Sequence, residues 1–297
     1  MNSARRPSRR ARWRGAAFLL PFGIPFLLFY VAPIAYAVVQ SLFREERAGG
    51  IFGKPETVFA GLAQYADVVA NPDFRAGVVR VFAFAAFQIP VVIVLAVALV
   101  LAVDSTRARF PRFFRLAYFF PYAVPTVVAT IMWGSFYSPD LSPLTSVGLR
   151  INFLDSSLVL FAIANIGIWT YCGYDVVILH SALQAVSPDV YEAARMDGAN
   201  ELLIALRIKL PLLRNALVLI AVFSIIGTLQ LFTEPQVMRA ISTAVTSTYT
   251  PSMLAFSTAS NNEYNAAAAI SVSLSAATFV LSFGFLRLAQ QRGWAVL

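Results

Sequence analysis

The stretch that decides the fold is VFAFAAFQIPVVIVLAVALVLAV, residues 81–103. It contains no Asp, Glu, Lys or Arg, and its length is about what a helix needs to cross roughly 30 Å of hydrocarbon. Because the interior of a bilayer offers no water to backbone amides, a segment that crosses it has to satisfy them internally, as a helix does. The stretch therefore predicts a membrane-spanning helix.

Similar windows without charged side chains recur along the whole chain. Hydrophobic residues make up 59% of the sequence and charged residues 13%, and the mean hydropathy is +0.70, outside the range of soluble globular proteins. The five further windows are residues 17–43, 116–138, 156–174, 215–233 and 264–286. We expect an all-α membrane protein with six transmembrane helices.

The basic residues predict how the chain is oriented. Lys and Arg concentrate in residues 5–14, 107–115, 195–214 and 287–292, which all fall on one side of the predicted helices. Basic loops remain in the cytoplasm, so both termini are expected there, in a multi-pass protein of the cytoplasmic membrane. The net charge of +8 follows the ends of the helices and suits contact with anionic membrane lipids, so no nucleic-acid partner is expected.

The cytoplasmic segment SPDVYEAARMDGAN, residues 187–200, has signals for a short helix at both ends. Ser187 is a good N-cap, Pro188 suits the first helical turn, and Gly198 suits the left-handed residue that follows a helix. Asn200 can cap a second helix, and another helical start is expected near Pro211. Two short helices that meet at a turn are therefore predicted beneath the membrane.

The spacing of this segment resembles the EAA loop of the permease subunits of bacterial binding-protein-dependent ABC importers. The matching residues, counted from the first Glu to the last Pro, are Glu192, Ala193, Ala194, Gly198, Ile208, Leu210 and Pro211, with Asp197 inside the same segment. The resemblance implies a six-helix permease whose cytoplasmic EAA loop, about residues 187–211, carries a coupling helix that docks in a cleft of an ATPase subunit.

The residue types fit such docking. Small side chains at 193 and 194 let a helix enter a groove, and Glu192 offers a carboxylate to a partner Arg. An amphipathic hairpin that only lies at the membrane interface is the alternative interpretation.

Other stretches resemble the sugar-transporting, maltose-permease-like branch of these importers, namely residues 59–65, 71–74 and Phe120-Pro121 with Pro125 and Trp133. The resemblance implies a carbohydrate cargo, a second permease subunit, two ATPase subunits and an extracytoplasmic solute-binding protein. Glycerol-phosphate or its diesters are the alternative cargo. The chain is expected to consist of a basic cytoplasmic N-terminal tail, residues 1–15, a transmembrane permease domain, residues 16–289, and a cytoplasmic C-terminal tail, residues 290–297.

The sequence predicts no catalytic or metal site. A phosphate-binding loop needs G-x-x-x-x-G-K-[ST], and neither Lys54 nor Lys209 stands in that pattern. ATP and Mg are therefore expected on the ATPase subunits, with no cofactor in this chain. One His and one Cys, Cys172, exclude a Cys-based metal cluster and make an intramembrane enzyme improbable. An ion-coupled secondary transporter is a further alternative, but the charge-free windows offer it no ionisable group.

Polar side chains within the predicted helices are candidates for the substrate path, because they are costly to bury against lipid. These candidates are Gln88, Asn165, Tyr171, Tyr174, Gln230 and Asn265. Hydrogen bonding between helices is the alternative role for each. Asp175 is expected near the cytoplasmic end of its helix, and Glu234 near the external end of the fifth helix. Residues 44–77 are expected to form an external loop with a short helix near 61–70.

Overall fold

The computed structural model describes residues 19–47, 55–104, 111–139 and 141–294 of the chain. Among these residues, five helices are long and apolar enough to cross a membrane. They are Leu19–Gln40, Pro72–Val103, Val159–Gln184, Arg214–Met238 and Tyr264–Gln291. The mainly helical fold is therefore confirmed, and the predicted N-terminal tail lies outside the described residues.

The third predicted span is not a straight helix. It is formed by α5 (Pro111–Ala123) and α6 (Thr126–Tyr137), and the two are bent by 100° at the break between them. Pro125 precedes α6 and has a backbone ψ of 130°, outside the helical range. A proline also disfavours helical geometry in the residue before it, which accounts for the break. The described part of the chain therefore has six spans only if this bent pair counts as one.

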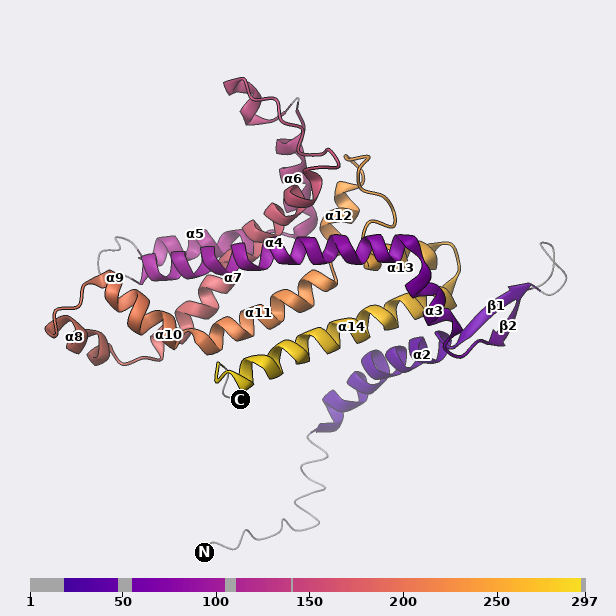
Figure 1. Ribbon diagram of the computed structural model, residues 1–297, viewed down its shortest axis with the longest axis horizontal. Coiled ribbons are helices and arrows are strands. Elements are labelled where there is room, and N and C mark those ends of the chain that lie inside the picture. The colour runs from indigo at the N-terminus through magenta and orange to yellow at the C-terminus, as the bar shows by residue number, and fades with distance from the viewer. Residues whose placement is uncertain (1–18, 48–54, 105–110, 140, 295–297) are drawn as a thin grey trace, which may run out of the picture.

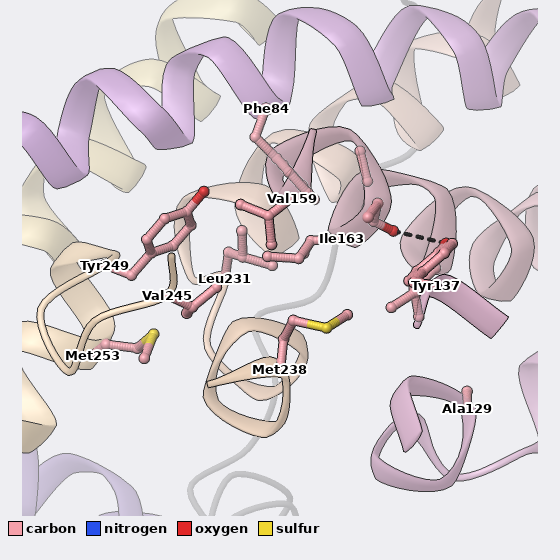
Figure 2. Packing of buried hydrophobic residues seen from close by; sticks show 13 residues of the cluster. Phe84, Ala129, Tyr137, Val159, Ile163, Leu231, Met238, Val245, Tyr249 and Met253 are labelled. Carbon is pink, nitrogen blue, oxygen red and sulfur yellow. Dashed lines mark hydrogen bonds between the residues drawn. The ribbon is translucent and has the colours of Figure 1, made fainter. Parts of the chain in front are cut away.

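The core of the bundle is built on α4 (Pro72–Val103) and α7 (Val159–Gln184). One buried cluster joins them through Val92, Ala96, Leu179 and Leu183. A second cluster, shown in Figure 2, extends from Phe84 on α4 to Met238 on α12 (Thr233–Met238). The helix that starts the described chain contributes no buried residue to either cluster, as a lipid-facing helix would.

The remaining helices complete the bundle. They are the π-helix η1 (Leu27–Val31) with α2 (Ala32–Gln40), the 3₁₀ helix η2 (Pro143–Val147), α11 (Arg214–Leu229), α13 (Pro251–Ser260) and α14 (Tyr264–Gln291). Between α7 and α11 the chain forms α8 (Pro188–Met196), α9 (Glu201–Ile204), the π-helix η3 (Ala205–Lys209) and α10 (Leu210–Leu212).

The predicted external loop contains more structure than a loop. Strands β1 (Phe43–Arg47) and β2 (Pro55–Phe59) pair antiparallel, with Phe43 opposite Phe59, so the fold is not purely helical. The short helix predicted near 61–70 is present as α3 (Ala63–Ala70). Helix α4 then begins inside the predicted loop, because Asn71 caps it through bonds from the amides of Asp73 and Phe74, 2.8 and 3.2 Å.

Different elements of the chain lie at the two ends of the bundle. In Figure 1 the helices α8, α9 and α10 lie at one end, which is also where α14 finishes, and β1, β2 and α3 lie at the opposite end. The predicted cytoplasmic helices α8 to α10 and the predicted external elements β1, β2 and α3 are thus separated along the length of the bundle.

Candidate functional site

The segment that resembles the EAA loop begins with helix α8, whose ends match the predicted signals. The Ser187 hydroxyl accepts a hydrogen bond from the amide of Asp189, 3.4 Å, and Pro188 is the first helical residue. At the other end Gly198 has a φ of +84°. Its amide donates to the carbonyl of Arg195, 3.0 Å, and the amide of Ala199 donates to that of Ala194, 2.9 Å. This is a Schellman motif, which needs a left-handed residue where Gly198 stands.

The chain then returns toward the membrane through a second capped helix. Asn200 accepts a hydrogen bond from the amide of Leu203, 2.8 Å, and so starts α9, as predicted. An ion pair between Arg195 Nε and Glu201 Oε1, 3.2 Å, joins the two short helices across the turn. The result is a hairpin of helices, residues 187–213, which we call the coupling hairpin.

One face of the coupling hairpin is open and the other is packed. Glu192 and Ala193 are exposed, and Met196 is 88% exposed. Ile204 and Leu213 are fully buried against the bundle. Of the other residues in the matched pattern, Ala194, Ile208, Leu210 and Pro211 are half-buried, whereas Gly198 is exposed, as is the neighbouring Asp197. The structure thus leaves the Glu-Ala part of the pattern accessible to another protein.

Sequence reasoning missed the contact that fixes this hairpin to the bundle. Lys209 is 3% exposed, and its Nζ lies 2.7 Å from Asp104 Oδ2 and donates to the Asp104 carbonyl, 3.0 Å. Asp104 is the residue that follows α4, so the pair connects two segments far apart in sequence. The signal for this contact in the sequence was a lysine between the apolar residues Ile208 and Leu210. A hairpin that only lay at the membrane interface would not require a lysine at this position.

Two further side chains complete this buried charge cluster. The Lys209 ammonium lies over the ring of Tyr191 on α8, 5.2 Å from its centroid, and His180 Nδ1 is 3.8 Å from Asp104 Oδ1. Burial and the neighbouring Asp104 carboxylate raise the pKa of Tyr191, and the face of its ring attracts the Lys209 cation. The end of α7, the end of α4 and helix α8 therefore meet around the pair of Lys209 and Asp104.

Deeper in the bundle, a cavity of about 360 Å³ lies between α4, the α5–α6 bend, α7 and the α11–α12 junction. Four of the six predicted path residues line it, namely Gln88, Tyr171, Tyr174 and Gln230. Asn165 and Asn265 do not. Asn165 instead donates to the hydroxyl of Tyr137, 2.8 Å, which donates to the Ala162 carbonyl, 3.0 Å, and so connects α6 to α7. Asn265 is buried in the first turn of α14.

The two carboxyl groups expected near the helix ends line the same cavity, each one residue beyond a charge-free window. Helix α7 continues to Gln184, so Asp175 lies well inside it and is 5% exposed. Glu234 is 7% exposed, in the first turn of α12. A charge-free window marks where apolar residues run together and does not mark where a helix stops.

No family model matches the chain. The chain is 28% identical over 228 residues to the arabinooligosaccharides transport system permease protein AraP of Bacillus subtilis (strain 168), which covers 74% of this chain and 70% of that protein. It is 26% identical over 300 residues to the diacetylchitobiose uptake system permease protein NgcF of Streptomyces coelicolor, covering 93% and 84%. It is 28% identical over 279 residues to the trehalose/maltose transport system permease protein MalF of Thermococcus litoralis, covering 91% and 90%.

The resemblance to sugar ABC transporter permeases is confirmed. The fold of the chain also agrees with a solved structure of a bacterial ABC transporter involved in the import of the acidic polysaccharide alginate, with a TM-score of 0.79 at 18% identity, covering 94% of this chain and 96% of the other. A second structure, of the alginate transporter in complex with a pentasaccharide-bound periplasmic protein, gives a TM-score of 0.78. The chain is therefore a multi-pass membrane protein that shares the fold of these solved transporter chains.

Proposed function

We propose that this permease is one of two membrane subunits of an ABC importer and that it moves a carbohydrate across the bacterial cytoplasmic membrane into the cell. The sugar permeases that it resembles support a sugar cargo over glycerol-phosphate. Its partners are a second permease subunit, two ATPase subunits and an extracytoplasmic solute-binding protein. Both of its termini face the cytoplasm.

The observation that carries the proposal is the coupling hairpin. Its helix α8 is capped at both ends and exposes Glu192 and Ala193 at one end of the bundle. A short helix with small side chains fits a groove on a partner protein, and an exposed carboxylate can form a charge-assisted hydrogen bond there. The partner in this proposal is an ATPase subunit, which binds ATP and Mg and hydrolyses the nucleotide.

The hairpin also has a route by which to move the bundle. Closure of the ATPase dimer displaces α8, and the contact of Tyr191 with Lys209 and the pair of Lys209 with Asp104 pass the displacement to the end of α4. Helix α4 lines the cavity through Gln88 and packs along α7. Packed helices switch between discrete arrangements, so the displacement alternates the access of the cavity between the two sides.

The test substitutes two glycines that have similar backbone angles but lie in different parts of the fold. Gly198 and Gly148 both have φ near +80° and both have open space where a Cβ would be, but Gly198 ends α8 and Gly148 ends η2 on a loop remote from the hairpin. A left-handed backbone costs a non-glycine residue about 1–2 kcal/mol. Gly198→Val therefore disfavours the native turn, although an added Cβ meets no atom within 4 Å. We expect it to abolish ATP-driven uptake of labelled oligosaccharide by vesicles with the assembled importer.

Gly148→Val is the matched control and should retain uptake, with both variants present in the membrane at the wild-type level. Normal uptake by Gly198→Val would refute the coupling role of the hairpin.

A further inference from the structure

The described residues that line the cavity include acidic side chains and no basic ones. Its lining includes two carboxyl side chains, Asp175 from α7 and Glu234 from α12, and no Lys or Arg is found among the described residues that line it. The two acids come from separate elements, so their convergence is a property of the fold and not of one helix.

One carboxyl oxygen of Asp175 is available to accept a hydrogen bond from a ligand in the cavity. The residue is 5% exposed, and within the described part of the chain its buried Oδ2 atom has no hydrogen-bond partner. A buried polar atom without a partner costs about 1–3 kcal/mol, and a carboxylate can accept several hydrogen bonds. A ligand with hydroxyl or ammonium donors in the cavity would recover this cost.

The remaining lining fits a sugar ring. The rings of Tyr122 and Tyr174 are stacked, with centroids 4.8 Å apart, and the Tyr171 ring is 6.3 Å from that of Tyr122. Aromatic faces offer apolar area and, in tyrosine, a polar hydroxyl. The amides of Gln88 and Gln230 add both donors and acceptors. A metal ion is a poorer fit, because no group of three metal-ligating side chains occurs among the described residues.

We propose that this cavity selects its cargo by charge, accepting oligosaccharides that are neutral or carry an amino group and rejecting those that carry carboxylates. The proposal rests on the proposed function as an importer and narrows its substrate class. In their ionised form, Asp175 and Glu234 repel a uronate in a site of low dielectric, where like charges interact more strongly than in water. The permease would then differ in cargo from the alginate transporters that share its fold.

The first experiment measures the charge of the cavity without any cargo. Ser224 lines the cavity and is half-buried, so Ser224→Cys in a Cys172→Ala background places one thiol there. The purified full-length chain is treated with a cationic and an anionic methanethiosulfonate reagent. We expect the cationic reagent to react about tenfold faster than the anionic one, corrected for their rates with a free thiol.

The carboxyl groups are then removed. Asp175→Asn with Glu234→Gln should bring the ratio of rates close to that of a free thiol, whereas Glu263→Gln, an exposed acid outside the cavity lining, should leave it unchanged. A ratio that is near unity in the parent protein, or that persists after both carboxyl groups are removed, would overturn the proposal.

The second experiment tests the ligand class with three trisaccharides, one of glucose (maltotriose), one of glucosamine and one of mannuronate. Maltotriose or the glucosamine trisaccharide should slow modification of the cavity thiol, and the mannuronate trisaccharide should not. Equal or better protection by mannuronate, or protection by none of the three, contradicts the proposal. Neither experiment needs ATP or uptake, so failure of the importer assay with the Gly198 and Gly148 variants remains a separate result.

Discussion

Lys209 shows how one residue inside an apolar pattern can hold two distant segments together. Its ammonium group is almost fully buried, whereas the carboxylate of Asp104 keeps 22% of its side-chain area exposed. A buried ion pair owes little of its stability to attraction alone, since both groups give up water to form it. Its value here is that the register between the coupling hairpin and α4 is fixed by one specific contact.

The different burial of the two partners predicts an asymmetry between single substitutions. Asp104→Asn leaves the Lys209 charge buried without its counter-ion, a change that costs about 3–5 kcal/mol in comparable sites. Lys209→Met removes the buried charge and fills a similar volume, and the remaining Asp104 can reach water. We expect Asp104→Asn to lower the thermal unfolding midpoint of the purified protein clearly more than Lys209→Met does. Equal midpoints, or the reverse order, would show that the pair is not buried as described.

Residue-level signals in the sequence were most informative where the structure depends on neighbours in the chain. The N-caps at Ser187 and Asn200 and the left-handed Gly198 were predictable, because caps and turns depend on residues three or four positions away. The partner of Lys209 was not predictable, because Asp104 lies 105 residues away and only the fold brings it near.

At the scale of elements, the approach of α5 to α7 depends on Gly173. A Cβ at this position would overlap the backbone carbonyl of Tyr118 on α5. Small residues allow membrane helices to pack this closely, since helix backbones can then touch. This contact positions the α5–α6 bend, which carries Tyr122 and Thr126 into the cavity lining.

Two glycine-to-alanine substitutions should therefore act in opposite directions. Gly173→Ala forces α5 away and should destabilise the protein by about 1–3 kcal/mol or more, as overpacking does. Gly284→Ala on α14 meets no atom within 4 Å, and alanine is the better helix former by about 1 kcal/mol, so it should be neutral or stabilising. Thermal unfolding of both purified variants checks this, and a Gly173→Ala protein as stable as the parent would contradict the close packing.

Charge-free windows located the helices but not their ends. Helix α4 starts at Pro72 and includes Asp73, Arg75 and Arg80, because a capping sequence, not hydropathy, starts it. Hydropathy also did not reveal the bend between α5 and α6. The geometry of proline produces this bend inside an apolar window. Apolar composition reports the solvent around a segment, whereas caps and prolines decide its backbone.

At the scale of the whole molecule, the coupling hairpin and the loop after α6 should face opposite sides of the membrane. Met196 and Leu141 are both well exposed, 88% and 67%, and suit cysteine substitution in a Cys172→Ala background. In intact spheroplasts a membrane-impermeant thiol reagent should label Leu141→Cys, and it should label Met196→Cys only after permeabilisation. Labelling of Met196→Cys from outside would reverse the orientation given by the basic residues.

The cavity illustrates what only the folded chain reveals. The sequence could nominate polar side chains within apolar segments, and four of the six share the cavity. It could not tell them from Asn165, which bonds a neighbouring helix, because both roles place an amide in an apolar window. It also did not show that Asp175 and Glu234 face the cavity, since this depends on where α7 stops and where α12 begins.

The most direct test of the central claim is a crosslink from helix α8 to an ATPase subunit in membranes that contain the assembled importer. Val190 is 43% exposed on α8, so Val190→Cys in the Cys172→Ala background places a thiol on the helix proposed to dock. A short thiol-to-amine crosslinker should join this chain to the ATPase subunit, and the yield should change when ATP is added. Leu141→Cys should give no such product. A Val190→Cys protein that never joins the ATPase subunit, with neighbouring positions on α8 equally negative, would contradict the account.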